Sequence, residues 1–352
     1  MGQQFDIRRC AVEGAPARVL IVDDSVVARS VLARMIDGTR RFMVVGAVPD
    51  ARAAIDYLGR NPVDVVLLDI EMPGVDGLTA LPDILAAGRG AKILVCSHAA
   101  DEGAAAAIQA LALGAADTLV KPGIGAFGGR FAEVLEDKLR RLFEPAPDLA
   151  SQPFVRQGLA EDYDIVAIGA STGGIHALSQ LLGAIPASFP LPILVTQHLP
   201  SSFMGYFATQ LASVSGRPCD IATDSMRIRS GRIIVAPGEA HLRVVRTSVG
   251  IAVRLTRERS ASGCMPSVDP MFQSIARVFG PRALAIVLSG MGRDGSEGAC
   301  DLAAAGAQIV VQDQASSVIW GMPGAIAAAG RASAVLPPDE IGRLVASRRR
   351  AN

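Results

Sequence analysis

Three side chains that could together hydrolyse an ester lie far apart in the sequence, from its middle to near its end: Ser171, His198 and Asp294. Ser171 belongs to GASTG, which fits the GxSxG pattern of a sharp strand-to-helix turn that exposes a serine hydroxyl. A serine becomes a nucleophile only when a base lies within hydrogen-bonding distance, and an acid must orient that base. His198 and Asp294 each follow an apolar run, so all three residues can meet at the carboxyl ends of parallel strands and form a serine hydrolase.

The glycines around Ser171 allow two other interpretations, a phosphate-binding loop or a serine that merely caps the next helix. A dinucleotide site requires GxGxxG and a carboxylate at the end of the next strand. Here the GxG pair is absent, and the next apolar run ends in Gln197 and His198. No Gly-Lys-Ser/Thr sequence follows, so a P-loop is not expected either. GxSxG by itself does not separate a nucleophile from a cap, so the partners of Ser171 decide between them.

The chain has four histidines from which the base could come. His98 lies in the first half, and His176 points to another side of the helix expected after the serine. His241 is an alternative base, with Asp220 or Asp224 as its acid, although no clear strand precedes either aspartate. His198 is favoured because it ends the strand that follows the serine across one βαβ unit, and strands linked in this way often lie side by side.

The first half carries a second, acidic set of reactive side chains. Asp23, Asp24 and Asp69 end apolar runs, and Lys121 ends another. Because parallel strands bind ligands at their carboxyl ends, three carboxylates would converge there and repel one another unless a hard cation such as Mg²⁺ lay among them. A carboxylate beside Mg²⁺ can attack a phosphoryl group, and Lys121 can pair with the phosphoryl oxygens.

Both sets of side chains require parallel sheets, and the hydrophobic pattern predicts two. Strand-like apolar runs alternate with Ala/Leu-rich helical segments over residues 16–143 and again over 163–346, which is typical of βαβ units in α/β domains. Residues 242–258 alternate apolar and polar side chains and predict an antiparallel hairpin appended to a second, mainly parallel, doubly wound sheet. A disordered N-terminal tail, an extended interdomain linker and a basic tail are predicted for the remaining segments, residues 1–15, 144–162 and 347–352.

Composition narrows the function classes. The 352 residues are 50% hydrophobic with a formal net charge of zero, which gives no electrostatic support for binding nucleic acid or a membrane surface. Five cysteines without a CxxC pair indicate neither a disulfide framework nor a zinc site. The N-terminus has no signal peptide, and no apolar run approaches the roughly 20 residues that span a bilayer. We therefore expect a cytoplasmic protein without membrane insertion, and a monomer.

The first-half motifs VLIVDDS, LLDIEMPGVDG and TLVKP resemble those of the response-regulator receiver family. The resemblance implies a flavodoxin-like fold and phosphorylation of Asp69 by a partner histidine kinase. It also implies a Mg²⁺ ion held by Asp23, Asp24, Asp69 and the backbone carbonyl of Glu71, with Lys121 binding the phosphoryl group.

The first half departs from the receiver pattern at the positions that spread the signal. The switch hydroxyl position falls on Cys96, with Ser97 next to it, and the switch aromatic position falls on Thr118. We expect the phosphorylation chemistry to be retained and the spread of the signal over the domain surface to differ.

The second-half motifs AIGASTGG, QHLP, IIVAPGEAHL, PSVDPMF, LSGMGRDGSEG and QDQASSVIWGMPGAIAAAG resemble, in order and spacing, the chemotaxis protein-glutamate methylesterase family. The resemblance implies that Ser171 is the nucleophile, His198 the base and Asp294 the orienting acid, with the backbone N–H groups of Thr172 and Met291 as oxyanion donors. No metal or other cofactor is implied for this half.

The substrate implied by the same resemblance is a chemoreceptor glutamate γ-methyl ester, hydrolysed to release methanol, with deamidation of receptor glutamines at the same site. Two departures concern the surroundings of the site. Cys264 and Met265 stand where a His-Arg pair is frequent, and Ile175 and His176 stand where a proline-containing turn is common. The alternative functions are a receiver controlling a catalytically inactive binding domain and a DNA-binding regulator, the latter without any basic helix-turn-helix in the sequence.

Overall fold

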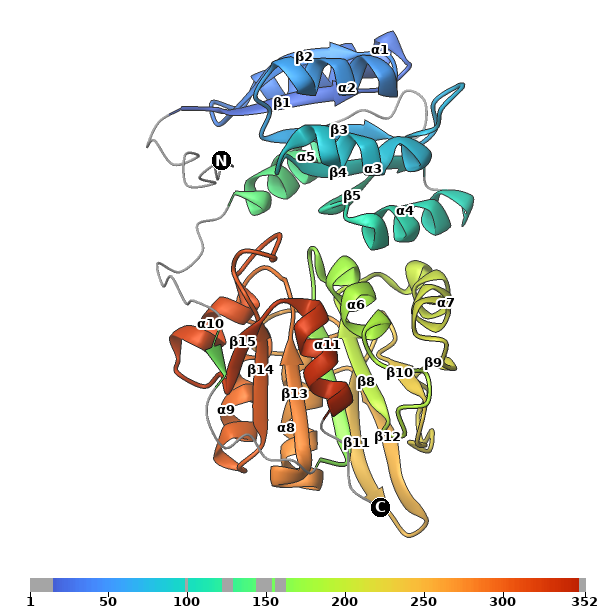
Figure 1. Cartoon of the computed structure of the whole chain (residues 1–352), viewed down its shortest axis with the longest axis vertical. Coiled ribbons are helices and arrows are strands. Elements are labelled where there is room, and N and C mark those ends of the chain that lie inside the picture. Colours follow the sequence, from blue (N-terminus) through green and yellow to red (C-terminus); the bar gives the residue numbers. More distant parts are fainter. Residues whose placement is uncertain (1–14, 99–100, 122–128, 144–153, 156–162, 348–352) are drawn as a thin grey trace. The chain divides into compact units, whose positions relative to one another are not determined.

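The protein is described by a computed structural model that covers residues 15–98, 101–121, 129–143, 154–155 and 163–347 (Figure 1). The chain divides into two compact units, Met1–Phe143 and Glu144–Asn352. Most of the predicted N-terminal tail, linker and basic tail lies outside the described residues.

The first unit is a five-stranded, wholly parallel sheet with the order β2-β1-β3-β4-β5. Its elements are β1 (Ala17–Val22), α1 (Val26–Asp37), β2 (Phe42–Val48), α2 (Ala51–Arg60), β3 (Val65–Asp69), α3 (Gly77–Gly88), β4 (Lys92–His98), α4 (Asp101–Leu113), β5 (Asp117–Lys121) and α5 (Gly129–Leu142). This strand order is that of flavodoxin-like domains, as expected. Side chains of α1 and α5 pack on one face of the sheet.

Local sequence fixes where three helices of the first unit begin. Ser25, Asp50 and Asp76 stand just before α1, α2 and α3, and the side chain of each accepts a hydrogen bond from a backbone N–H in the first turn. Such caps satisfy amides that have no partner within the helix. The strand ends at Asp23 and Asp69 are therefore followed at once by ordered turns and helices.

The second unit contains an eight-stranded sheet with the order β6-β15-β14-β13-β7-β8-β10-β9, parallel except for β6, and a separate β11–β12 hairpin. Its strands are β6 (Phe154–Val155), β7 (Ile165–Ala170), β8 (Ile193–Gln197), β9 (Cys219–Ile221), β10 (Ile233–Val235), β11 (His241–Thr247), β12 (Gly250–Thr256), β13 (Ala283–Val287), β14 (Gln308–Gln312) and β15 (Ala334–Leu336). Its helices are α6 (Gly174–Gly183), η2 (Ser201–Phe203), α7 (Met204–Ser215), α8 (Val268–Phe279), η3 (Gly280–Arg282), α9 (Ser296–Ala304), α10 (Met322–Ala328) and α11 (Pro338–Ser347).

The predicted fold class, two doubly wound α/β domains with an appended antiparallel hairpin, is confirmed. Three short strands were not predicted: β6, β9 and β15. Two residues of the predicted linker, Phe154 and Val155, form β6 and pair with β15, so this part of the segment is not simply extended and unpacked. Runs of two or three residues carry too little periodicity to be recognised from sequence.

The strand order places the reactive loops of the second unit together. After β7 the chain adds β8, β9 and β10 on one side of the sheet, with β10 lying between β8 and β9, and then returns to add β13, β14 and β15 on the other side. The carboxyl ends of β7 and β13 are therefore neighbours at the point where the strand order reverses, which is where open α/β sheets bind ligands. Beneath them, α8 packs its apolar side chains between the sheet and the hairpin (Figure 1).

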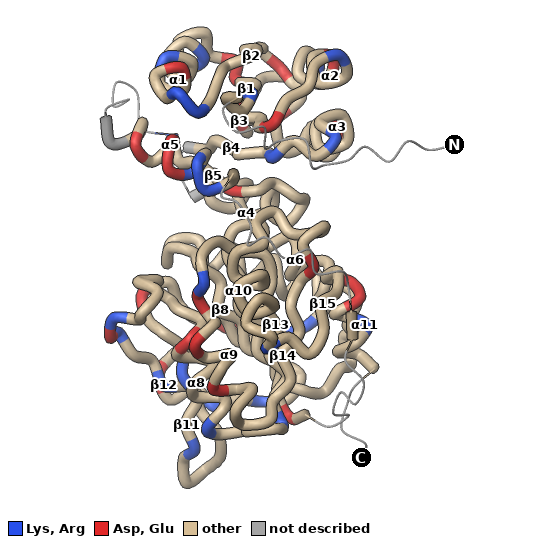
Figure 2. The backbone as a smooth tube through the Cα atoms, turned by 90° about the vertical axis from the view of Figure 1, so that its left-hand side faces the viewer, with Lys and Arg blue, Asp and Glu red and all other residues tan. Residues whose placement is uncertain are grey.

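Charged residues are interspersed along both units rather than collected in one region (Figure 2). The central strands β13 and β14 contain no Asp, Glu, Lys or Arg, and their side chains are almost all buried. Among the described helices, none has both the length and the apolar character needed to cross a bilayer.

Candidate functional site

Ser171 lies in a tight turn between β7 and α6. Its N–H donates to the carbonyl of Ser289, and Gly173 adopts a φ of +77° that brings the chain into α6. A Cβ atom at Gly173 would lie 2.6 Å from Val318 and 2.7 Å from the Ser289 hydroxyl, so the turn requires glycine both for its conformation and for its space. The residue that caps α6 is Gly173, with no side-chain bond, so the interpretation of Ser171 as a helix cap is wrong.

The serine hydroxyl faces an imidazole and a carboxylate in line. Ser171 Oγ lies 3.2 Å from His198 Nδ1, and His198 Nε2 lies 2.7 Å from Asp294 Oδ2. An ionised carboxylate can only accept, so Nε2 carries the proton shared with Asp294 and, in the neutral ring, the Nδ1 lone pair faces the serine. The three side chains come from the ends of β7 and β8 and from the loop after β13, as the sequence predicts.

Asp294 is almost completely buried and receives several hydrogen bonds. Ser267 Oγ donates to Oδ1 at 2.6 Å, and the Val268 N–H donates to Oδ2 at 2.7 Å. Burial by itself would raise the pKa of Asp294, but the bonds from His198, Ser267 and Val268 more than offset this and hold the pKa well below its usual range. Asp269, close by, is affected in the opposite sense: burial and the charge of Asp294 raise its pKa to about 6.

The ionised carboxylate of Asp294 changes the pKa of the His198 imidazole. Burial alone would lower the pKa of His198, but hydrogen bonds with Asp294 and with Cys264 more than offset that and raise the pKa to about 9. The imidazolium that forms when the base takes a proton is therefore strongly stabilised.

Sequence reasoning missed the residues that hold the Asp294 carboxylate. Ser267 and Val268 stand at the start of α8, within the PSVD motif, where helix N-termini present donors to anions. The loop before α8 is in turn fixed by His241, whose Nδ1 accepts from the Ser267 N–H at 2.9 Å and whose Nε2 donates to the Glu258 carbonyl at 2.8 Å. The only signal in the sequence for the contact between PSVD and Asp294 is a serine placed just before a helix, whose hydroxyl here donates to the carboxylate rather than capping α8.

The alternative base, His241, is rejected by this geometry. It is completely buried and uses both ring nitrogens in backbone hydrogen bonds. Its two candidate acids are engaged elsewhere, since Asp220 binds Arg232 and Asp224 accepts from the Leu255 N–H. His176 contacts Gln180 on its own helix, 2.9 Å away.

Two backbone amides that the sequence predicts as oxyanion donors, those of Thr172 and Met291, belong to segments close to Ser171. The loop containing Gly290 lies against the serine so closely that a Cβ at Gly290 would be 2.9 Å from Ser171 Cβ. Met291 follows Gly290 directly in the chain, and Thr172 follows Ser171. Within the described part of the chain, neither of these N–H groups makes a backbone hydrogen bond. Gln197, which the sequence did not single out, donates to the Ser171 carbonyl at 2.9 Å and steadies the turn.

In the first unit, the predicted acidic site is assembled at the carboxyl edge of the sheet. Ligand oxygens of Asp23, Asp24 and Asp69 lie within 4.8 Å of one another. Lys121 Nζ lies 2.7 Å from an oxygen of Asp23 and 2.7 Å from one of Asp69, so one cation is shared by two carboxylates. The Glu71 N–H donates to Asp69 at 3.2 Å.

The charge balance of this edge favours a cation. Burial raises the pKa of Asp69, with a further contribution from the charge of Asp23, although Lys121 acts to lower it. Burial by itself would lower the pKa of Lys121, but its hydrogen bonds with the two carboxylates raise it. Three carboxylates against one ammonium form an all-oxygen donor set that suits Mg²⁺.

A buried thiol, Cys96, stands in β4 where the sequence predicts the switch hydroxyl position. Cys96 pairs with Asp69 in the register of β3 and β4, and its side chain packs in the apolar cluster that includes side chains of α1 and α5. Burial raises the pKa of this thiol to about 12, so it stays protonated beside the acidic site. Since successive strand residues point to opposite faces, the buried Ser97 is directed away from that cluster. Thr118 is half-buried in β5.

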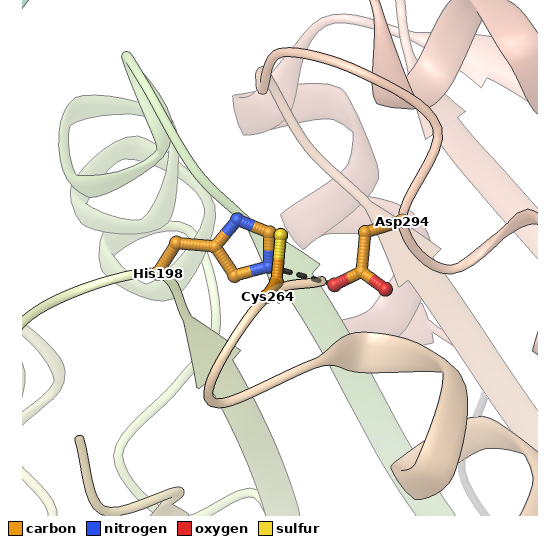
Figure 3. A group of neighbouring side chains, drawn as sticks. All are labelled: His198, Cys264 and Asp294. Atoms are coloured by element: carbon orange, nitrogen blue, oxygen red, sulfur yellow. Dashed lines mark hydrogen bonds and ion pairs between the residues drawn. The ribbon is translucent and has the colours of Figure 1, made fainter. Parts of the chain in front are cut away.

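A second group of potential metal ligands adjoins the serine. Donor atoms of His198, Cys264 and Asp294 lie within 4.8 Å of one another. Figure 3 shows the thiol beside the imidazole, with the Asp294 carboxylate directed at the same ring. Cys264, which the sequence marked only as a departure from a family pattern, is thus an immediate neighbour of the candidate base.

Comparison with known proteins finds relatives of both units. The family model described as CheB methylesterase matches residues 166–345, and that of the response regulator receiver domain matches residues 19–125. A protein-glutamate methylesterase/protein-glutamine glutaminase of Azospirillum brasilense is 39% identical, covering 94% of this chain and 92% of that protein. One from Pseudomonas aeruginosa is 38% identical, covering 93% and 95%. The crystal structure of the Thermotoga maritima CheB methylesterase catalytic domain matches with a TM-score of 0.51 and 31% identity, covering 53% of this chain and 98% of that domain.

Proposed function

Since the chain belongs to the CheB methylesterase family and carries a receiver domain, we propose that it hydrolyses glutamate γ-methyl esters of chemoreceptors and deamidates receptor glutamines, with Ser171 as its nucleophile. It is a receiver-regulated protein-glutamate methylesterase and protein-glutamine glutaminase of chemotaxis adaptation. The observation that carries the assignment of Ser171 is the continuous set of contacts from its hydroxyl through His198 to Asp294 at the strand-order reversal.

The first chemical step forms an acyl-enzyme. His198 Nδ1 takes the hydroxyl proton as Ser171 Oγ attacks the ester carbonyl, and Asp294 stabilises the resulting imidazolium. The oxyanion of the tetrahedral intermediate accepts hydrogen bonds from the amides of Thr172 and Met291. At comparable sites, loss of one such donor slows the reaction by about 10²–10³.

Loss of methanol completes the first step, and hydrolysis then regenerates the serine. Nδ1 gives its proton to the departing methoxide, which leaves as methanol. His198 next deprotonates the water that attacks the acyl-enzyme and returns that proton to Ser171 Oγ as the acyl group leaves. The products are a glutamate side chain and the free serine hydroxyl. A glutamine substrate follows the same path and releases ammonia instead of methanol.

For the receiver domain we propose that Asp69 accepts a phosphoryl group from a histidine kinase. Asp23, Asp24, Asp69 and the Glu71 carbonyl would hold Mg²⁺, which neutralises charge on the phosphoryl oxygens when bound. Lys121 moves from the carboxylates to those oxygens. Phosphorylation then shifts an equilibrium between states of different activity, and a tenfold change in rate requires only about 1.4 kcal/mol.

Replacement of the nucleophile tests the proposal. Ser171→Ala should reduce methanol release from a methylated receptor at least about 10³-fold, because the remaining groups provide no covalent path. Ser179→Ala is the matched control, since that hydroxyl donates within α6, to the Ile175 carbonyl, away from the groups assigned to the reaction. Mass spectrometry of the receptor peptides would identify which glutamates lose a methyl group and which glutamines are converted. Wild-type activity in Ser171→Ala would reject the mechanism, and a wild-type chain with no esterase activity would favour a binding domain.

A further inference from the structure

The Cys264 side chain has no role in the hydrolytic mechanism, yet it lies against its base. It belongs to the loop before α8 and is half-buried, as is His198, whereas Asp294 is buried behind them. The three residues come from separate parts of the chain, so the folded structure is what brings an imidazole nitrogen, a sulfur and a carboxylate oxygen within 4.8 Å of one another (Figure 3).

This donor set has a definite metal preference. Thiolate and imidazole ligands together favour Zn²⁺, whereas the three carboxylates of Asp23, Asp24 and Asp69 favour Mg²⁺. Zinc sites with three protein ligands keep a fourth position for water or another small ligand. Because His198 and Cys264 are only partly covered, an ion can reach them from solvent.

The geometry requires a small adjustment. Tetrahedral Zn²⁺ bonds its ligands at about 2.0–2.3 Å, which places the donor atoms roughly 3.3–3.7 Å apart. The imidazole and carboxylate, now 2.7 Å apart, must therefore separate slightly to admit the ion. The carboxylate is fixed by Ser267 and Val268, so the partly buried imidazole and thiol are the groups that move.

We propose that His198, Cys264 and Asp294 form an inhibitory binding site for Zn²⁺. The ion takes the place of the proton that Nε2 shares with Asp294, and the thiol releases its own proton to solvent. With Nε2 bound to metal, the neutral ring must carry its proton on Nδ1. Nδ1 then has no lone pair for the Ser171 hydroxyl, so the general base is lost while the nucleophile stays in place. The inhibition, though not the binding, rests on the proposed function.

Binding is tested with Co²⁺ alone as a spectroscopic probe of the full chain, reduced and in excess Mg²⁺ to occupy the carboxylate site. We expect a thiolate-to-cobalt charge-transfer band whose intensity at saturation corresponds to one Co²⁺ ion per chain. The band should disappear in Cys264→Ser and persist in Cys300→Ser, whose thiol is exposed on α9. It should also persist in Ser171→Ala, which lacks the nucleophile but keeps all three ligands.

Inhibition is tested with Zn²⁺ alone in the methanol-release assay. Half-inhibition of the wild-type chain and of Cys300→Ser should occur at the same Zn²⁺ concentration, and Cys264→Ser should require at least tenfold more. A chelator should restore activity. Absence of the cobalt band, or equal Zn²⁺ sensitivity of Cys264→Ser and the wild type, overturns the proposal. A cobalt band in a wild-type chain that shows no esterase activity would reject the proposed function and leave the metal site standing.

Discussion

Asp69 and Asp294 are both buried carboxylates at the carboxyl edges of parallel sheets, yet their pKa values shift in opposite directions. Asp294 accepts hydrogen bonds from an imidazole, a hydroxyl and a backbone amide. Among the described residues, no other carboxylate accepts from these three donors. Asp69 has to share the ammonium of Lys121 with Asp23. The hydrogen-bond donors available to each carboxylate, rather than its depth of burial, therefore explain why the two pKa values shift in opposite directions.

The difference explains what each edge can do. A carboxylate already satisfied by protein donors stays ionised and stabilises a cation that appears during the reaction, the imidazolium of His198. A carboxylate in an excess of negative charge needs an external cation and can then act as an acceptor for a phosphoryl group. Similar sheet edges thus support acyl transfer in one unit and phosphoryl transfer in the other.

The largest predicted effect comes from neutralising Asp294, the carboxylate that has its own hydrogen-bond donors. Asp294→Asn should lower kcat for methanol release by about 10⁴, because an amide cannot hold the imidazole in the required tautomer or stabilise its charge. Phosphorylation of Asp69 by acetyl phosphate should be unchanged, as measured by phosphate incorporation. A loss of less than tenfold would mean that Asp294 is not the orienting acid.

The reciprocal change tests the other edge. Asp69→Asn should abolish phosphate incorporation and with it the stimulation of methanol release by a phosphodonor, for which a tenfold effect needs only about 1.4 kcal/mol. The rate without phosphodonor should stay near that of the wild type, because Asp69 is not among the hydrolytic groups. Stimulation that survives in Asp69→Asn would place the phosphorylation elsewhere.

Removing one hydrogen-bond donor from Asp294 should make its surroundings more like those of Asp69. Ser267→Ala deletes the bond to Oδ1, and a hydrogen bond to a charged group contributes about 1.5–3 kcal/mol, so kcat should fall roughly 10- to 100-fold. Since the serine is a positioning residue, KM should change little. An equal rise in KM with kcat unchanged would instead indicate a role in substrate binding.

The smallest effect concerns the pH dependence of the base. Only the neutral imidazole accepts a proton, so kcat/KM should rise with pH until it passes the pKa of His198, about 9. The contact with Cys264 contributes to raising that pKa, so Cys264→Ser should move the rising limb to lower pH and increase the rate at neutral pH. Profiles measured with a chelator present, and with Cys300→Ser as control, test this; a shift to higher pH would contradict it.

Much of the fold could be predicted because its signals are local. Apolar runs separated by Ala/Leu-rich helical segments indicate parallel strands, and short polar residues at the ends of those runs indicate which side chains reach the sheet edge. The prediction failed where pairing rather than pattern defines the element. Phe154 and Val155 read as part of a linker, and only their pairing with β15 makes them a strand.

The sequence by itself determined the α/β class, the turn that exposes Ser171 and the residue types at the strand ends, because each depends on a few neighbouring residues. Only the tertiary structure decided that Nδ1 rather than Nε2 of His198 faces the serine, that Ser267 and Val268 hold Asp294, and that Cys264 lies beside the base. Those contacts join segments brought together by strand order and by the packing of α8. Their geometry follows from how side chains fill shared space, which no local pattern of residues encodes.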